Sequence, residues 1–402
     1  MGIPGKDVCP KGHQGFESLP LRKNLCHNAC VKNLLVKCRN AIIRFCYVAI
    51  LKPVYFRMDP EKVHDGMIAF GASLGRFAFL RALCRLAFGY SNKKLEQKIL
   101  GMTFVNPVGL AAGFDKNAEL TQILPCVDFG FEEVGSITGE PCLGNRKPRL
   151  WRLPKSKGLV VYYGLKNDGC LAVAARLEDV AFENRIGTSV AMTNCKENLD
   201  TEKAIADYVK AFHAFVLIGD YFTVNVSCPN AEGGQTFMNA QKLDRLLTEL
   251  DRIPTEKPIF IKLSPDISFA DVDLILEVAK KHRVHGIITT NLTKKRDNPK
   301  ILDQNVPKVG GISGKPVAEL ANQLLSYIYK KERSRFVLIG CGGIFTAEDA
   351  YKKIRLGASL VQLITGMIFE GPQAVSEINR GLVQLLERDG FKNISEAIGV
   401  DA

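Results

Sequence analysis

The chain has 402 residues, of which 46% are apolar and 24% are charged, a composition that excludes a disordered or fibrous protein. Its net charge of +12 is uneven, because residues 1–100 carry 17 Lys and Arg against 6 Asp and Glu, whereas the other 302 residues carry 37 against 36. A basic head on a neutral body favours an anionic partner for the head alone. The lack of helix-turn-helix, zinc-finger and RNA-binding signatures argues against nucleic acid.

Residues 1–40 form the first predicted segment, which is basic, poor in acids and either targeting-like or disordered. Cys9, His13, Cys26 and Cys30 within it have a spacing that fits no standard zinc site, and we expect no bound metal. The twelve cysteines of the chain are scattered without a CxxC pair, which is typical of reduced thiols.

Residues 41–100 are predicted to form a helical, membrane-associating extension. Apolar residues recur in it at near-helical spacing, while Arg81 and Arg85 lie one turn apart. The apolar positions are Phe70, Leu74, Phe77, Leu80, Leu83, Leu86 and Phe88. This pattern predicts a helix that lies in a membrane interface, and the alternative is a helix packed on the body of the protein. The run 42–51 is too short to span a bilayer and contains Arg44.

Residues 101–402 alternate between short apolar runs and helix-length amphipathic stretches. The runs are 104–112, 131–137, 188–193, 222–227, 259–264, 286–291, 336–340 and 360–365. Eight apolar runs in strict alternation with helices predict a closed parallel (β/α)8 TIM barrel rather than an open sheet. A capping-box-like sequence begins at Thr346, and residues 139–169 form a Pro- and Gly-containing excursion between the second and third strands.

Polar residues follow several of these runs, and barrel enzymes carry their chemistry at the carboxyl ends of the strands. These residues are Asp115, Lys116, Ser136, Asn225, Ser227, Cys228, Asn230, Lys262, Asn291 and Thr365. We expect them to converge on one face of the barrel, where they would form an active site.

Two motifs carry specific chemistry. The sequence Gly-Cys-Gly-Gly at 340–343 follows the seventh strand, and Thr365-Gly366 follows the eighth, which is the usual position of a barrel phosphate site, although a plain turn also explains the glycines. In the segment 224–230, two asparagines offer paired donors and acceptors for a planar amide or imide. Cys228 is a candidate general base, because a thiol pKa is readily tuned toward neutrality, and the alternative is an inert buried cysteine.

Six ordered motifs together resemble the dihydroorotate dehydrogenase family. They are GLAAGFDK at 109–116, GS at 135–136, NVSCPN at 225–230, IKLSPD at 261–266, GISGKP at 311–316 and GG at 342–343. The resemblance runs from about Tyr55 to the C-terminus, and MDPEKVH at 58–64 is similar to the entry helices of the membrane-associated, quinone-linked class. It implies oxidation of dihydroorotate to orotate in pyrimidine biosynthesis, with FMN as cofactor and ubiquinone or a related quinone as acceptor.

The resemblance also implies roles for individual residues. FMN would be lined by Ala111, Ala112, Gly113, Phe114, Asp115, Ser136, Thr193, Asn225, Lys262, Thr290, Gly314, Gly343, Ile364 and Thr365. The substrate would be bound by Lys116, Asn225, Asn230, Asn291, Tyr163, Gly164 and Leu165. Cys228 would remove the C5 proton, and His64 and Arg152 would line the quinone path. The implied location is the mitochondrial inner membrane in a eukaryote or the cytoplasmic face of the inner membrane in a bacterium.

Four positions depart from the pattern of that class. Cys228 is typical of the soluble class, whereas the membrane-associated class has serine there. The segment 161–166 has the sequence VYYGLK in place of an Asn-Arg-x-Gly-Phe-Asn motif, so that Val161 replaces an orotate-binding asparagine. Thr193 stands for a flavin-contacting asparagine, and Ile364 for a tyrosine. These changes leave two alternatives open: a related FMN oxidoreductase that acts on another cyclic amide or uses fumarate or NAD, and a non-catalytic membrane-bound relative.

Overall fold

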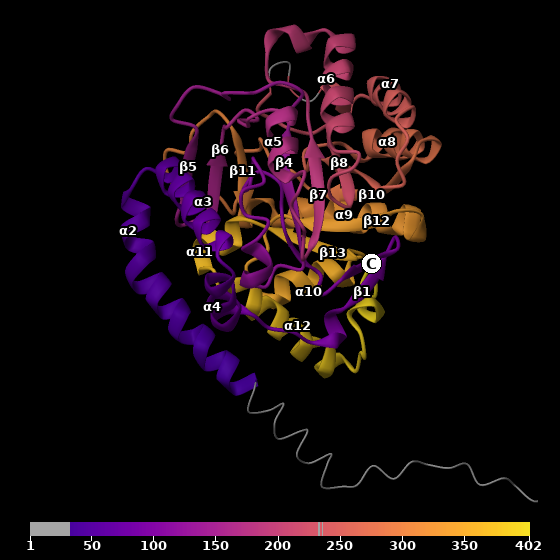
Figure 1. Cartoon of the computed structure of the whole chain (residues 1–402). Helices are drawn as coiled ribbons and strands as arrows, with labels where there is room; N and C mark the ends of the chain where they lie inside the picture. The colour runs from indigo at the N-terminus through magenta and orange to yellow at the C-terminus, as the bar shows by residue number, and fades with distance from the viewer. Residues whose placement is uncertain (1–32, 232–233, 235) are drawn as a thin grey trace, which may run out of the picture.

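The computed structural model describes residues 33–231, 234 and 236–402, and it contains a closed barrel of eight parallel strands in the order β10-β12-β13-β3-β4-β7-β8-β9 (Figure 1). The predicted (β/α)8 barrel is therefore confirmed. The barrel strands are β3 (Val108–Leu110), β4 (Phe131–Ile137), β7 (Arg185–Val190), β8 (Tyr221–Asn225), β9 (Ile259–Leu263), β10 (Val284–Thr289), β12 (Val337–Cys341) and β13 (Leu360–Leu363).

The first apolar run, 104–112, is divided between two elements rather than forming one strand. Phe104 ends β2 (Met102–Phe104), which pairs with β1 (Gln97–Ile99) as an antiparallel hairpin. Met102 and Phe104 pack with Phe131, Tyr221 and Phe260 in one apolar cluster. This cluster brings together the hairpin and residues at the amino ends of three barrel strands, so the hairpin closes the end of the barrel opposite the predicted site.

Helices cover the outside of the barrel because their apolar faces pack on the strands. They are α5 (Cys170–Leu177), α6 (Thr201–Ala214), α7 (Ala240–Asp251), α8 (Phe269–Lys281), α9 (Ala318–Glu332), α10 (Ala347–Arg355) and α12 (Ala374–Asp389). The short helix α11 (Thr365–Glu370) lies instead at the carboxyl end of β13. The predicted capping box is present at Thr346, whose hydroxyl accepts from the amide of Asp349. Only a 3-10 turn, η3 (Leu124–Val127), follows β3.

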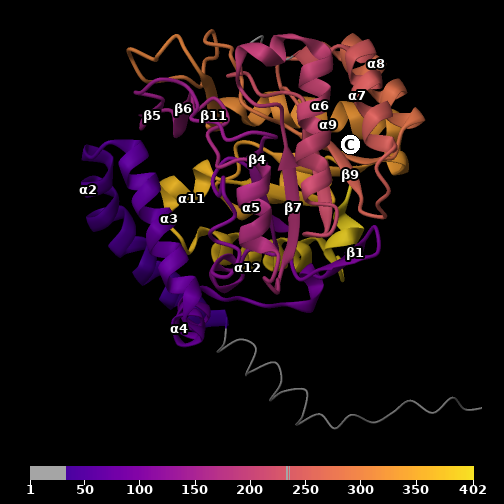
Figure 2. The ribbon, with the colours of Figure 1, turned by 45° about the horizontal axis from the view of Figure 1, so that its top comes forward.

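The head consists of a helical stretch at residues 33–45, the π-helical turn η1 (Cys46–Leu51), α2 (Lys52–Arg57), α3 (Pro60–Arg76) and α4 (Ala78–Phe88). Figure 2 shows α2 and α3 along one flank of the barrel, beside α11 and the small sheet. An added Cβ on Gly71 of α3 would lie 2.7 Å from Leu120, so the head packs closely on the loop that follows β3. The helices α3 and α4 thus pack on the segment that follows β3.

The sequence predicted one helix over residues 70–88. In the structure this stretch is divided between α3 and α4, which meet at an angle of 112°. Phe77 has an extended backbone, and Arg81 donates to the carbonyl oxygen of Gly75 at 2.8 Å, which satisfies a free acceptor at the end of α3. Arg85 forms an ion pair with Glu183 of the barrel domain at 2.5 Å. Both arginines therefore contact protein.

The excursion at 139–169 builds a second sheet over the carboxyl end of the barrel. It contributes β5 (Leu150–Leu153) and β6 (Gly158–Val161), and β6 also pairs with β11 (Gly311–Gly314) in an antiparallel sheet of three strands. Leu153, Val160 and Ile312 form its small core. The sheet thus covers the carboxyl end of the barrel with apolar side chains.

Within the described residues, no single helix is long and apolar enough to cross a membrane, although α3 and α4 taken together meet that test. The same part of the chain contains no cluster of three or more His, Cys, Asp or Glu side chains placed to hold a metal ion. Most of the targeting-like segment 1–40, with Cys9, His13, Cys26 and Cys30, lies outside the described residues.

Candidate active site

One pocket opens at the carboxyl ends of the barrel strands, and it encloses about 1240 Å³ of space free of protein atoms, including open solvent at its mouth. Barrel loops, α3 and the small sheet all contribute to its wall. The predicted residues that line it are His64, Ala111, Ala112, Gly113, Phe114, Lys116, Ser136, Tyr163, Gly164, Leu165, Asn225, Cys228, Asn230, Lys262, Thr290, Asn291, Gly314, Gly343, Ile364 and Thr365. Residues that are far apart in the chain thus converge as predicted.

Asn225 lies at the centre of a hydrogen-bond network on the pocket floor. Its amide nitrogen donates to the hydroxyl of Ser136 at 2.8 Å, and its amide oxygen accepts from Asn291 at 3.1 Å. Ser136 also shares a hydrogen bond of 2.8 Å with Ser189. These contacts fix the orientation of the Asn225 and Asn291 amides before any ligand binds.

Lys262 carries a buried positive charge beneath the pocket. Its Nζ atom lies 3.8 Å from Oε1 of Glu133, and the two side chains are 5% and 0% exposed. The other oxygen of Glu133 accepts from Gln362 at 2.8 Å and from Thr223 at 3.2 Å. Glu133 is therefore the buried counter-ion of Lys262, and it is held by side chains of β13 and β8, which each lie two strands away from β4 in the barrel.

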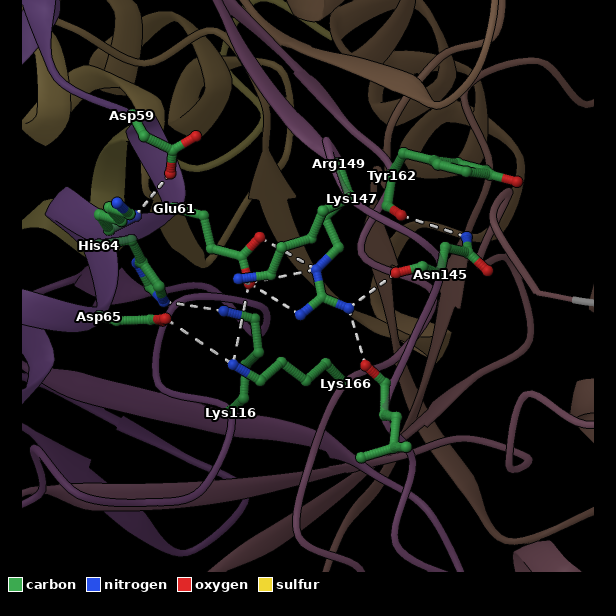
Figure 3. Close-up of polar contacts among 12 residues, drawn as sticks. Asp59, Glu61, His64, Asp65, Lys116, Asn145, Lys147, Arg149, Tyr162 and Lys166 are labelled. Atoms are coloured by element: carbon green, nitrogen blue, oxygen red, sulfur yellow. Dashed lines mark hydrogen bonds and ion pairs between the residues drawn. The ribbon is translucent and has the colours of Figure 1, made fainter.

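Lys116 lies in a polar cluster where α3 meets the pocket (Figure 3). Its Nζ atom is 2.8 Å from Nε2 of His64 and 4.1 Å from the centre of the Tyr163 ring. Burial, and then the charge of Lys166, lowers the pKa of Lys116 to about 8. Burial also lowers the pKa of His64 well below its ordinary value, so a neutral His64 accepts the hydrogen bond.

Cys228 lines the pocket after β8, but its pKa moves in the direction opposite to the expected one. Burial raises the pKa of the Cys228 thiol to about 11, despite hydrogen bonds from the backbone at Asn230 and Ala231 that lower it. The expected tuning of this thiol toward neutrality was therefore wrong. Cys228 is a thiol at neutral pH.

The glycine loop after β12 lies close against the start of α9. Gly343 has a φ of +78°, and an added Cβ would lie 2.3 Å from Cβ of Ala318. Any larger residue would have to move this loop, which carries backbone N–H groups to the pocket wall. The loop is suited to a close backbone approach to a phosphate.

Four predicted residues do not line the pocket. One is Ser227, whose hydroxyl donates to the carbonyl oxygen of Lys262 at 2.6 Å. Asp115 accepts from the amides of Glu119 and Leu120 at 2.8 and 2.6 Å, so it organises the loop after β3. Thr193 donates to Asp207 of α6 at 2.8 Å. Arg152 donates to the carbonyl oxygen of Met58 at 2.8 Å and supports the junction of α2 and α3. In each case a partner within the protein holds the side chain away from the pocket.

Several lining residues were not predicted as site residues. Leu150 and Leu159 of the small sheet and Ile368 of α11 add an apolar wall. Val161 and Lys166, which the sequence marked only as departures, also line the pocket, and the carbonyl oxygen of Val161 accepts from Asn230 at 2.9 Å. The long excursion at 139–169 was the available signal, because loops of that length in barrels often cover the active site.

Comparisons with known proteins agree with this architecture. The family model for dihydroorotate dehydrogenase matches residues 94–386. A protein of Gloeobacter violaceus named dihydroorotate dehydrogenase (quinone) is 37% identical over 354 residues, which cover 87% of this chain and 98% of that protein. A protein of the same name from Haloarcula marismortui is 39% identical over 311 residues, which cover 77% of this chain and 87% of that protein.

A solved structure also matches: DHODH from Eimeria tenella in complex with ferulenol has a TM-score of 0.77 and 30% identity, covering 85% of this chain and 96% of that one. The fold and the site define a class of protein: a barrel enzyme whose pocket, at the carboxyl ends of the strands, combines polar side chains with an apolar wall. The chain belongs to the dihydroorotate dehydrogenase family.

Proposed function

We propose that this chain oxidises dihydroorotate to orotate with FMN as cofactor and a quinone as electron acceptor, a reaction of pyrimidine biosynthesis. The observation that carries the proposal is the convergence of Lys116, Cys228, Lys262 and Asn291 on one pocket. Proteins named dihydroorotate dehydrogenase (quinone), at 37% and 39% identity over most of the chain, support this substrate and this acceptor.

The residues present fit FMN. The tight loop at Gly343 and the hydroxyl of Thr365, which lies 2.8 Å from that of Ser313, suit a phosphate, while the fixed amide of Asn225 suits a planar ring. Lys262 supplies a positive charge in a water-poor site, where it stabilises added negative charge. When bound, FMN supplies the acceptor for the hydride that leaves the substrate.

The side chains divide the remaining work between binding and proton transfer. Lys116 offers a cation to the carboxylate of dihydroorotate, and Asn225 and Asn291 offer amide groups to its ring. Oxidation removes a hydride from C6 and a proton from C5, which leaves a double bond between the two carbons. Cys228 takes the C5 proton in the fraction of molecules whose thiol is ionised, and it thereby returns to the thiol.

The head provides the proposed route for the quinone. His64 of α3 lines the pocket beside the apolar side chains of Leu150, Leu159 and Ile368. An apolar wall that leads from the head to the barrel suits a quinone ring with a hydrophobic tail. Arg152 lies at the outer end, against Phe56, where its guanidinium carbon is 4.8 Å from the ring centre.

We place the enzyme at a membrane surface, with residues 41–100 as the attached part. Many apolar side chains of the head are exposed, and the head is the basic part of the chain. They are Ile42, Phe45, Ile50, Leu51, Val54, Met58, Met67, Phe70, Phe77, Phe79, Leu83 and Leu86. In a eukaryotic cell this surface is the mitochondrial inner membrane, and in a bacterium it is the cytoplasmic face of the inner membrane.

Anaerobic addition of dihydroorotate to the purified flavoprotein tests the proposal. The flavin absorbance should bleach, and a quinone analogue should restore it. A flavin that stays oxidised would exclude dihydroorotate as substrate. Faster reoxidation by fumarate or NAD than by quinone analogues would overturn the assignment of the acceptor.

A further inference from the structure

We infer that Lys166 is a second cationic contact for the substrate carboxylate and acts together with Lys116, so that the pocket selects its ligand by charge. The inference rests on the proposed function and adds a specificity residue to it. The observation is a pair of lysines that both line the pocket and face the same side of α3 (Figure 3).

The acidic partners of Lys166 come from one face of α3. Glu61 and Asp65 lie four residues apart on that helix, and each has a carboxylate oxygen 3.9 Å from Nζ of Lys166. His64, between them in the sequence, contacts Lys116 at 2.8 Å. One turn of the head helix therefore positions both pocket lysines.

The charge of Lys166 is only loosely compensated. Glu61 is bound more tightly by Arg149, at 2.8 Å, and by Lys147, at 3.3 Å, than by Lys166. Asp65 has a side chain that is 50% exposed, so water and salt screen its charge. The four cations Lys116, Lys147, Arg149 and Lys166 thus meet the carboxylates of Glu61 and Asp65 and, beside Lys116, that of Asp115. Of the four cations, Lys116 and Lys166 line the pocket.

Two ammonium groups beside the same cavity repel each other, and a bound anion relieves that repulsion. The effect is visible at Lys116, whose pKa is lowered first by burial and next by the charge of Lys166, while Asp65, Asp115 and Glu61 oppose the shift. An anionic ligand between the two lysines would raise the pKa of Lys116 again, because its negative charge offsets the repulsion between them. Because both lysines line the pocket, the geometry favours a ligand carboxylate beside them.

The other residues of the pocket make the charge of Lys166 more important for substrate specificity. Val161 lines the pocket with a side chain that can form no hydrogen bond. One N–H of the Asn230 amide donates to the carbonyl oxygen of Val161 at 2.9 Å, and the amide oxygen of Asn230 is buried without a hydrogen-bond partner among the described residues. With fewer amide groups available to the ring of the substrate, a larger part of the specificity falls on the carboxylate.

The test is equilibrium binding of orotate to the holoenzyme, followed by the change in flavin absorbance. Uracil serves as the neutral probe, since it shares the ring but has no carboxylate. Lys166→Ala should weaken orotate binding roughly five- to tenfold, the effect of one partly exposed charge pair, and leave uracil binding unchanged. Lys166→Arg should bind orotate within about threefold of the parent, because it keeps the charge.

Lys147 is the matched control, because it pairs with the same Glu61 but does not line the pocket. Lys147→Ala should change orotate affinity less than about twofold. Asp65→Asn should change the affinity in the opposite direction to Lys166→Ala, since it removes an acidic competitor for Lys166. FMN content and melting temperature, measured for every variant, show that the fold is intact.

Equal orotate affinity in the parent and in Lys166→Ala would overturn the inference, and so would an equal loss for orotate and uracil. The proposed function fails by a different result, namely a flavin that dihydroorotate does not bleach in the parent protein. The two failures are therefore distinguishable.

Discussion

Nζ of Lys262 and Oε1 of Glu133 lie 3.8 Å apart inside the barrel, directly below the proposed flavin site, and both side chains are almost fully buried. A negative charge at this position partly cancels the field that Lys262 exerts on the pocket. The pair therefore sets how strongly the site stabilises electrons added above it.

Glu133→Gln should raise the reduction potential of the bound flavin. The amide keeps an oxygen for Thr223 and Gln362 but removes the charge, so that about 1–2 kcal/mol of extra stabilisation of the reduced form is expected, or roughly 20–40 mV for two electrons. Glu132→Gln is the control, because burial and the nearby Asp115 raise the pKa of Glu132 and keep it neutral. Equilibrium titration with redox dyes gives both potentials; equal shifts in the two variants would rule out a role for the Lys262 pair.

The pH dependence of flavin reduction should report Cys228. With a pKa of about 11 in the ligand-free protein, only about one thiol in a thousand is ionised at pH 8, so the rate should rise with pH across the range from 7 to 10. Stopped-flow reduction by dihydroorotate measures this. Cys228→Ser should move the rise to higher pH because a hydroxyl is a weaker acid, and Cys228→Ala should slow reduction by about 10²- to 10⁴-fold. An alanine variant as fast as the parent would exclude Cys228 as the base.

Orotate affinity should fall as the pH rises through about 8 and above, because Lys116 loses its proton and with it the attraction for the carboxylate. The protonated form binds the anion, so affinity is full below this range. Lys166→Ala removes the repulsion that helps to lower the pKa of Lys116, and the decline should then begin at higher pH. Orotate binding isotherms at several pH values test this prediction. Parallel isotherms for uracil correct for titration of the ring. A decline at the same pH in both proteins would contradict the coupling.

Gly343→Ala should reduce FMN content and lower stability. The new Cβ would meet Ala318 at 2.3 Å in a backbone with φ of +78°, and overpacking of this kind typically costs about 1–3 kcal/mol in addition to the backbone strain. Gly390 has a φ of +79° but no neighbour within 4 Å, so Gly390→Ala isolates the backbone cost, about 1 kcal/mol. Measurements of FMN content and of thermal unfolding distinguish the Gly343→Ala variant from the Gly390→Ala variant. Equal FMN loss in both would mean that the close contact at Gly343 is unimportant.

The exposed apolar residues of α4 give a test of membrane attachment. Phe79 and Leu86 are 71% and 75% exposed, so Phe79→Asp with Leu86→Asp should leave the fold intact and weaken vesicle binding roughly tenfold or more. Turnover with a long-tailed quinone should fall, while flavin bleaching by dihydroorotate should not change. Leu217→Asp is the control, since Leu217 is 94% exposed but lies outside the head. Vesicle binding that is unaffected by the α4 changes would exclude this surface.

Much of the fold and part of the site followed from local sequence patterns. Buried parallel strands require continuous apolar runs, so the run at 131–137 predicted β4 with its observed bounds. Polar residues that end such runs converge in any barrel, which is why Lys116, Asn225, Lys262 and Asn291 could be assigned to one site. The run at 104–112 was misjudged because apolarity alone does not distinguish a barrel strand from the hairpin strand that ends at Phe104.

Local patterns in the chain were therefore enough to predict the barrel, the direction of its catalytic end and the residue types gathered there, because each of these depends on periodicity over a few residues. The three-dimensional packing was needed to show that α3 turns Glu61, His64 and Asp65 toward Lys116 and Lys166, and that Thr193 and Arg152 turn away from the pocket. It also decided the direction of the pKa shift of Cys228. These outcomes depend on burial and on contacts between distant segments, and such contacts leave no periodic trace in the chain.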